Sequence, residues 1–187
     1  MIEVFDNFLE PNQFRNLQAE FLSDNMKWTY GPVIGDSNNL PFLGNITGEP
    51  DREYNFQFCN ALYNRCEPIS EDFYLISPLL DAINIAALIR VKANLNTRTS
   101  KIIEHGYHID QNFAHALSGI FYLNTCDGYT AFEESGRRVE SVANRMLISD
   151  NTLMHTGTTT TNCDRRVVIN INFFPALDKV GTSINYT

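Results

Sequence analysis

A histidine and an aspartate separated by one residue stand out in the stretch HGYHIDQNF, residues 105–113. Side chains two positions apart on a β-strand point to the same side, so His108 and Asp110 would project together from an extended segment. Imidazole nitrogens and carboxylate oxygens both bind divalent metals. Such a pair also occurs at the surface of many strand ends, so it does not establish a metal site by itself.

A second imidazole lies further along the chain, where His155 ends the stretch NTLMH. Several β-like runs separate it from Asp110, and antiparallel strands could return it to the first pair. Two histidines and one carboxylate with open coordination positions are typical of non-haem Fe(II) oxygenases, although zinc also accepts this set. We therefore expect His108, Asp110 and His155 to bind a metal and form the catalytic centre.

An arginine ten positions after His155 begins the run RRVVININFF. Arg165 shares one face of this run with apolar residues, and Arg166 shares the other with Asn170 and Asn172. Because an apolar face should line the core, the pattern predicts that Arg165 points inward and Arg166 outward. A buried guanidinium needs an anionic partner, which a dicarboxylate could provide through a bidentate contact. An internal salt bridge, for instance to Glu133, is the alternative.

The elements around these residues read mainly as strands. From residue 105 onward, short β-like runs alternate with turn formers such as CDG and SG, which predicts an antiparallel sandwich or barrel such as a jelly roll. Residues 89–95 predict a strand before it. Residues 77–88 predict a short helix with Ser77 as its N-cap and Pro78 in its first turn.

The first eighty residues predict a supporting region with strands at 1–9, 27–33 and 54–63, and a helix that begins near Pro11. Residues 31–51 are rich in Gly, Pro, Asn and Asp and predict a long irregular loop. Such loops are often lids over a binding site, but a solvated connector is an equal alternative. The length of 187 residues fits one domain, with 1–84 as N-terminal support and 85–175 as the catalytic part.

The order of these motifs resembles the Fe(II)/2-oxoglutarate-dependent dioxygenases, and within them the prolyl 4-hydroxylase-like branch. The resemblance covers roughly residues 85–175 and rests on H-x-D, the YLN run, the GYTAF segment, the distal histidine and the following arginine. It implies a mainly β double-stranded β-helix, or jelly roll, with supporting helices. It further implies a hydroxylase that acts on a C–H bond of a protein side chain, such as prolyl, or of a small molecule, with succinate and CO2 as co-products.

The same resemblance assigns roles to individual residues. It implies Fe(II) held by His108, Asp110 and His155, and 2-oxoglutarate held by Arg165 with the hydroxyl of Tyr122. Asn94 matches a position where some relatives contact the co-substrate. Ascorbate is a further candidate cofactor, and dioxygen and an unidentified substrate complete the expected partners.

The sequence departs from that branch at two places. DGYT stands where the branch commonly has GGE, which puts Thr130 at a position that is frequently acidic. The approach to H-x-D reads NTRTSKIIEHGY instead of a glycine-rich segment. Both departures concern the substrate rather than the metal. Halogenating relatives carry a small residue where Asp110 stands, so the aspartate favours hydroxylation.

Composition narrows the function classes. A net charge of −8 argues against nucleic acid as a partner, because phosphate contacts need clustered lysine and arginine. The four cysteines form no C-x-x-C pair, and the acidic N-terminus lacks the pattern of a signal peptide. We expect free thiols, a cytoplasmic location and no membrane contact.

Two other classes compete with the oxygenase. One is a non-enzymatic jelly-roll binding protein whose His/Asp/His site is vacant or holds zinc. The other is a cupin-like isomerase or dioxygenase that does not use 2-oxoglutarate. Such cupins usually bind their metal with more histidines, and this chain has only four.

Overall fold

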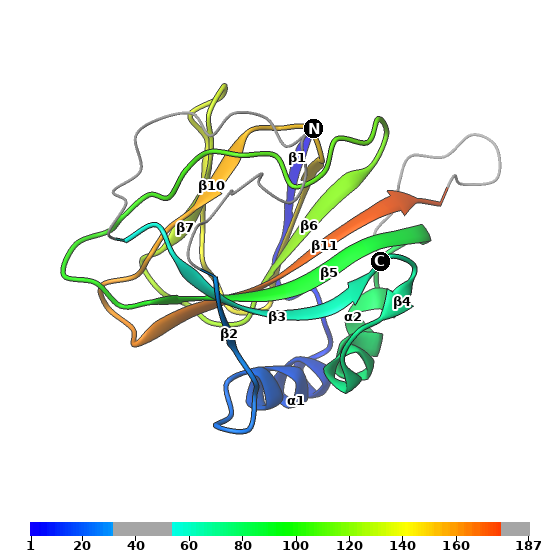
Figure 1. Cartoon of the computed structure of the whole chain (residues 1–187), viewed down its shortest axis with the longest axis horizontal. Coiled ribbons are helices and arrows are strands. Elements are labelled where there is room, and N and C mark those ends of the chain that lie inside the picture. Colours follow the sequence, from blue (N-terminus) through cyan, green and yellow to red (C-terminus); the bar gives the residue numbers. More distant parts are fainter. Residues whose placement is uncertain (32–53, 177–187) are drawn as a thin grey trace.

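The computed structural model describes residues 1–31 and 54–176 and is built around one large antiparallel sheet (Figure 1). Seven of its eight strands follow the order β1-β9-β6-β11-β5-β3-β2, and the eighth, β4, pairs with β3 at one side. The strands of the large sheet are β1 (Ile2–Phe5), β2 (Thr29–Gly31), β3 (Gln57–Asn64), β4 (Glu67–Pro68), β5 (Ile85–Thr97), β6 (Leu117–Tyr122), β9 (Arg145–Asp150) and β11 (Arg165–Pro175).

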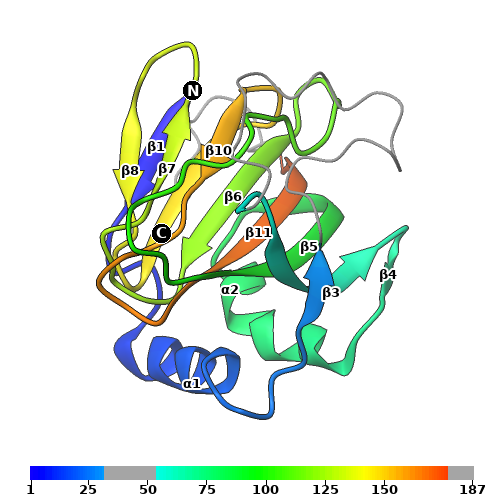
Figure 2. The ribbon, with the colours of Figure 1, turned by 60° about the vertical axis from the view of Figure 1, so that its left-hand side comes forward.

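A smaller three-stranded sheet faces the large one, in the order β10-β7-β8 (Figure 2). Its strands are β7 (Tyr129–Phe132), β8 (Arg138–Glu140) and β10 (His155–Gly157). The chain passes repeatedly between the two sheets, as a jelly roll requires. The structure is mainly β with supporting helices, which confirms the predicted fold class.

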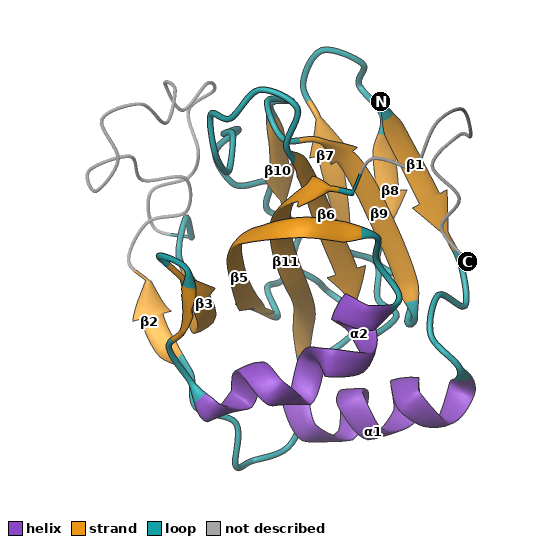
Figure 3. Cartoon of the chain, turned by 90° about the vertical axis from the view of Figure 1, so that its right-hand side faces the viewer, coloured by secondary structure: helices purple, strands orange, loops and turns teal. Residues whose placement is uncertain are grey.

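The helices cover the face of the large sheet that is turned away from the small one (Figure 3). Helix α1 (Pro11–Phe21) begins with proline, whose missing N–H is not needed in the first turn. It buries Leu17 and Phe21. A 3-10 turn (Glu71–Ile76) leads into the short α2 (Ser77–Asp81). None of the helices within the described ranges has the length and apolar content to cross a membrane.

Two apolar clusters hold these layers together. The larger one lies between the helices and the large sheet and includes Phe21, Leu79, Val91, Phe121 and Ile169. The smaller one lies between the two sheets and includes Ile120, Tyr122, Phe132, Leu147 and Val168. The large sheet is therefore covered on both faces. Phe121, Phe132 and Leu147 are all part of this core packing and are at most 2% exposed.

Several local predictions need correction. The predicted helix at 77–88 ends at Asp81, and Ile85–Leu88 belong instead to β5, where β-branched and apolar residues extend the pairing with β11. The side chain that caps the helical segment is Ser70, whose Oγ accepts from the N–H of Asp72, and not Ser77. The loop predicted at 31–51 lies outside the described residues apart from Gly31, so its role as a lid stays a prediction.

Candidate metal centre and co-substrate pocket

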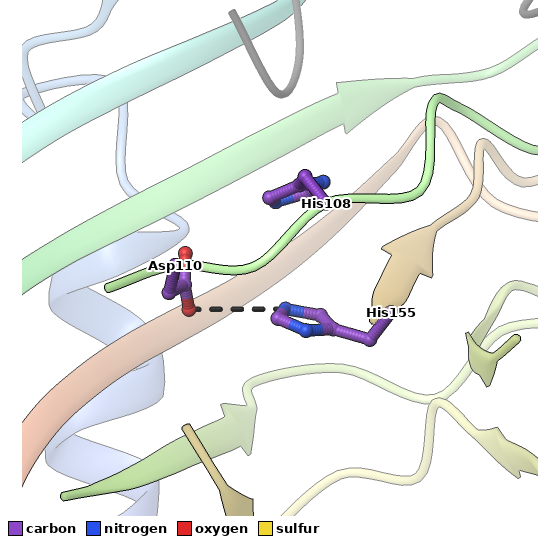
Figure 4. Close-up of side chains that lie close together, drawn as sticks. All are labelled: His108, Asp110 and His155. Atoms are coloured by element: carbon purple, nitrogen blue, oxygen red, sulfur yellow. Dashed lines mark ion pairs between the residues drawn. The ribbon is translucent and has the colours of Figure 1, made fainter. Parts of the chain in front are cut away.

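Two neighbouring side chains, His108 and Asp110, meet the distant His155 between the two sheets (Figure 4). The candidate ligand atoms of His108, Asp110 and His155 all lie within 4.8 Å of one another. Nε2 of His155 lies 3.8 Å from Oδ2 of Asp110, and the two imidazole rings lie with their centroids 5.0 Å apart. One ion could therefore contact all three side chains at once.

The backbone brings the two histidines together by a direct bridge. The N–H of His108 donates to the carbonyl of His155 at 2.9 Å, and the N–H of His155 donates back at 3.0 Å. His155 begins β10, which pairs with β7. The segment around His108 was expected to be a strand, but this bridge is its only pairing at His108. The convergence of His108 with Asp110 is confirmed although the strand that was used to predict it is absent.

Each histidine is oriented through its second ring nitrogen. Nδ1 of His108 lies 2.9 Å from the carbonyl oxygen of Gly106, and Nδ1 of His155 lies 3.0 Å from that of Leu153. A carbonyl oxygen only accepts, so both Nδ1 atoms carry the proton and both Nε2 atoms are left as ligands. Carbonyl partners of this kind are typical of metal-binding histidines.

Asp110 is held by a polar network that spans three strands. Its Oδ1 accepts from Nη2 of Arg90 at 2.6 Å, and its Oδ2 accepts from Nδ2 of Asn172 at 3.3 Å. Arg90 and Asn172 are themselves joined by a 3.1 Å hydrogen bond, and Asn172 also donates to Ser118 at 2.9 Å. The carboxylate is therefore fixed from β5, β6 and β11.

The electrostatics keep His108 and Asp110 in the form that binds a metal. Burial lowers the pKa of His108 to about 4, with a further lowering from His155, so its imidazole is neutral near pH 7. Burial by itself would raise the pKa of Asp110, but Arg90, with further contributions from His155, His108 and Lys92, more than offsets it, and the net shift is downward. Asp110 is thus ionised although it is almost fully buried.

A polar cavity of roughly 430 Å³, part of it open to solvent, extends from the two histidines along the inner face of the large sheet. Its lining is formed by Gln57, Lys92, Asn94, Asn96, His105, His108, Ile120, Thr130, His155, Gly157, Arg166, Val168 and Asn170. A cavity with this many amides and cations suits a small polar ligand better than an apolar one.

Arg166 lies at the end of this cavity opposite Asp110 and is only 2% exposed. Its Nη2 donates to Oγ1 of Thr130 at 3.1 Å, and its guanidinium carbon lies 5.5 Å from the centre of the Tyr122 ring. Gly128 makes room for it, since a Cβ there would lie 2.6 Å from Cδ of Arg166. Its buried Nε has no hydrogen-bond partner among the described residues. A carboxylate in the cavity would satisfy that donor.

The prediction that Arg165 points inward is wrong. Its Nη2 donates to the carbonyl of Leu22 at 2.5 Å, beyond α1 and away from the cavity. Alternation along β11 was correctly recognised, but the apolar face carries Val167 and Ile169 toward the helices, not toward the second sheet. The other face, with Arg166 and Asn170, lines the cavity. Between the sheets, the part of the interior that forms the cavity is mainly polar, and the smaller apolar cluster fills the rest.

The other expected co-substrate residues lie close by. Asn94 lines the cavity and accepts a hydrogen bond from the Cys59 thiol at 3.4 Å. Tyr122 is fully buried beside Arg166, and its hydroxyl donates to Oγ1 of Thr130 at 2.8 Å. Thr130 therefore joins Tyr122 to Arg166, which explains why a hydroxyl stands at this position.

Sequence reasoning missed or misplaced several cavity residues. His105 was not among the predicted site residues, but it is 3% exposed and lines the cavity, and its Nε2 lies 3.2 Å from Nδ2 of Asn96. Burial lowers its pKa to about 3, so it is neutral. Lys92 and Asn96 were not singled out. The sequence does indicate that these side chains share one face of a strand, because polar residues occupy every second position from Arg90 to Asn96. The fourth histidine, His115, is exposed, and all four cysteines are free thiols, as predicted.

Comparison with solved structures places this fold among those of non-haem oxygenases. A prolyl hydroxylase from Trichoplax adhaerens, in complex with a peptide fragment of hypoxia inducible factor, is 14% identical with a TM-score of 0.59, covering 93% of this chain and 83% of its own. SnoN, an α-ketoglutarate-dependent epimerase of nogalamycin biosynthesis, is 11% identical with a TM-score of 0.57. That match covers 98% of this chain and 87% of SnoN. HygX from Streptomyces hygroscopicus, with nickel and 2-oxoglutarate bound, is 10% identical with a TM-score of 0.54. That match covers 94% of this chain and 83% of HygX.

The likeness lies in structure and not in sequence. No protein-family model matches the chain, and no curated protein sequence matches it. At identities of 10–14%, what the chain shares with these enzymes is the double-stranded β-helix fold. A shared fold does not carry a shared function, so the activity has to be argued from the site.

Proposed function

We propose that this protein is an Fe(II)- and 2-oxoglutarate-dependent oxygenase that hydroxylates a C–H bond of its substrate. The observation that carries this proposal is one cavity with a His/Asp/His triad near one end and a buried arginine with an unpartnered Nε at the other. The ligand set fits Fe(II) and leaves coordination positions open. The triad alone would also fit zinc, but zinc gives no reason for a buried arginine aimed into the cavity.

The residues of the triad would bind the metal in forms that are already prepared. Nε2 of His108 and of His155 is the free ring nitrogen in each case, because the carbonyls of Gly106 and Leu153 hold the other. Arg90 and Asn172 hold the carboxylate of Asp110 in place. Little side-chain reorganisation is therefore needed on metal binding, which is the purpose of such supporting contacts.

The far end of the cavity would bind the co-substrate. The Arg166 guanidinium would hold the C5 carboxylate of 2-oxoglutarate, with Thr130 and Tyr122 fixing its orientation. Asn94 and Asn96 would provide polar contacts along the wall of β5. HygX with nickel and 2-oxoglutarate, and SnoN with Fe3+ and α-ketoglutarate, show that this fold accommodates such a pair.

The chemistry supplied by bound Fe(II) with 2-oxoglutarate and dioxygen is insertion of an oxygen atom into a C–H bond, with succinate and CO2 as co-products. The chain contributes orientation and shielding. Phe132 packs close to the metal centre, with its ring centroid 6.1 Å from that of His155, and the apolar cluster behind it closes that side to water.

The test is formation of succinate from 2-oxoglutarate, measured with added Fe(II) and air in the absence of any substrate. The wild type should turn over slowly and lose activity when Fe(II) is replaced by Zn(II). His155→Ala and Asp110→Ala should each lower the rate at least 100-fold, with circular dichroism confirming that the fold is kept. Succinate formation that persists in both variants would rule out the triad as the catalytic metal site.

A further inference from the structure

Strand β5 carries a row of polar side chains on its cavity face. Lys92, Asn94 and Asn96 line the cavity, and Arg90 reaches Asp110 at the end of the same row. The residues between them, Val91, Ala93 and Leu95, belong to the apolar cluster under the helices. Of the cations in the row, Arg90 already has a carboxylate partner, so Lys92 is the one that needs an explanation.

Lys92 lies between the two ends of the cavity. It pairs across the sheet with Asn170 on β11, whereas Asn96 is opposite Arg166 and Arg90 is opposite Asn172, the partner of Asp110. Its charge contributes to the lowered pKa of both His108 and Asp110, so it acts directly on the metal centre. Lys92 therefore stands on the cavity wall next to the place where a metal-bound reaction would occur.

No acidic residue in the described part of the chain forms an ion pair with this lysine. Across residues 1–31 and 54–176, its ammonium makes no salt bridge or hydrogen bond. The charge of Asp110 acts on Lys92, but that carboxylate is already paired with Arg90 at 2.6 Å. Burial lowers the pKa of Lys92, and the charge of Arg90 lowers it further. The side chain of Lys92 is half-buried in the cavity wall, and an anion that enters the cavity would stabilise its charged form.

The charge balance of the loaded site points the same way, given the proposed function. Arg90, Lys92 and Arg166 together with a divalent metal face the single carboxylate of Asp110 and a doubly charged co-substrate. Positive charge therefore remains in excess after the metal and 2-oxoglutarate have bound. A neutral substrate would leave that excess in a poorly solvated cavity, whereas an anionic one would reduce it.

We propose that the substrate is an organic anion and that Lys92 binds its carboxylate beside the metal centre. This inference rests on the proposed function. The carboxylate could also come from the co-substrate, since Lys92 could instead contact the C1 carboxylate of 2-oxoglutarate. Arg166 and a metal already match the two carboxylates of the co-substrate, which favours the substrate as the partner of Lys92.

The experiment uses the full chain loaded with Mn(II) and N-oxalylglycine, an inert mimic of 2-oxoglutarate. The probe is acetate labelled with carbon-13 at the carboxyl carbon, whose relaxation is enhanced when it binds near the paramagnetic ion. Labelled acetamide is the neutral control of the same shape. Three proteins are compared: the wild type, Lys92→Gln and Lys101→Gln, in which an exposed lysine is removed. Calorimetry measures the affinity of each protein for N-oxalylglycine.

The wild type and Lys101→Gln should enhance acetate relaxation at least fivefold over acetamide. In Lys92→Gln, the relaxation enhancement of acetate should fall to that of acetamide. The affinity of this variant for N-oxalylglycine should stay within threefold of the wild-type value. Removing this unpaired charge from a half-buried position should not unfold the protein. Lys92→Arg, which keeps the charge, should retain the acetate effect.

Three results would overturn the proposal. Acetate relaxation that is equal in the wild type and Lys92→Gln would show that the lysine binds no carboxylate. A tenfold loss of N-oxalylglycine affinity in Lys92→Gln would assign the lysine to the co-substrate instead. Failure of the wild type to bind N-oxalylglycine at all would contradict the proposed function, and the inference about Lys92 would fall with it.

Discussion

Arg90 donates to Oδ1 of Asp110 at 2.6 Å, so the carboxylate of the metal triad is already half of a buried ion pair. Asp110 is 3% exposed and Arg90 is 18% exposed. Removing one member of such a pair leaves an uncompensated charge. The pair therefore ties the stability of the metal-free protein to the integrity of the metal centre.

The first prediction concerns Arg90→Leu. Because this change leaves Asp110 charged and unpaired, the metal-free protein should lose about 2 kcal/mol of unfolding free energy. Mn(II) would supply a new positive partner, so the metal-induced rise in Tm should be larger in the variant than in the wild type. Arg138→Leu, which breaks the exposed pair with Glu104, is the control and should change stability by less than about 1 kcal/mol. An unchanged metal response in Arg90→Leu would contradict the role of the pair.

The second prediction separates the two neighbouring arginines. Arg166→Gln should weaken N-oxalylglycine binding to the Mn(II) protein by about 100-fold, since a buried charge-assisted contact to carboxylate contributes about 3 kcal/mol. Arg165→Gln should leave the affinity within threefold, because its side chain contacts the Leu22 carbonyl instead. Calorimetry decides between them, and the reverse ranking would mean that Arg166 is not the co-substrate arginine.

The third prediction concerns the space that Gly128 leaves for Arg166. A Cβ at position 128 would lie 2.6 Å from Cδ of Arg166 and 2.7 Å from the carbonyl oxygen of Thr159. Gly128→Ala should therefore displace the arginine and lower N-oxalylglycine affinity at least tenfold. Gly136→Ala is the matched control: its φ of +63° strains an alanine, but nothing lies within 4 Å of the new Cβ. It should cost about 1 kcal/mol of stability and leave binding unchanged.

The fourth prediction concerns the hydroxyl of Thr130. Its Oγ1 accepts from the Tyr122 hydroxyl at 2.8 Å and from Nη2 of Arg166 at 3.1 Å. Thr130→Val keeps the shape but leaves both buried donors without that acceptor, so it should cost about 2 kcal/mol of unfolding free energy. Thr130→Ser keeps the hydroxyl and should lower the unfolding free energy clearly less than Thr130→Val does. Equal losses for the two variants in chemical denaturation would show that packing, and not the hydrogen bonds, explains this residue.

The grouping of His108, Asp110 and His155 could be predicted from sequence because their types and order restrict the chemistry more tightly than secondary structure does. His108 does not lie on a regular strand, yet it meets His155 through a single backbone bridge. The orientation of Arg166 could not be predicted in the same way. Alternation divides β11 into two faces, but it does not say which face the helices cover and which one contains the site.

Lys92 shows a second limit of sequence reasoning. The polar alternation from Arg90 to Asn96 is visible in the sequence, but a polar strand face normally indicates solvent. Only the small sheet, which folds over the large one, turns this face into the wall of a cavity. The positions of Lys92 and His105 therefore depend on tertiary structure that local patterns do not contain.

The most direct test of the central claim is a crystal structure of the protein with Mn(II) and N-oxalylglycine. We expect a single ion bound by Nε2 of His108, a carboxylate oxygen of Asp110 and Nε2 of His155. The mimic should chelate that ion and place its distal carboxylate on the guanidinium of Arg166. An ion bound elsewhere, or a mimic that leaves Arg166 without a carboxylate, would contradict the account.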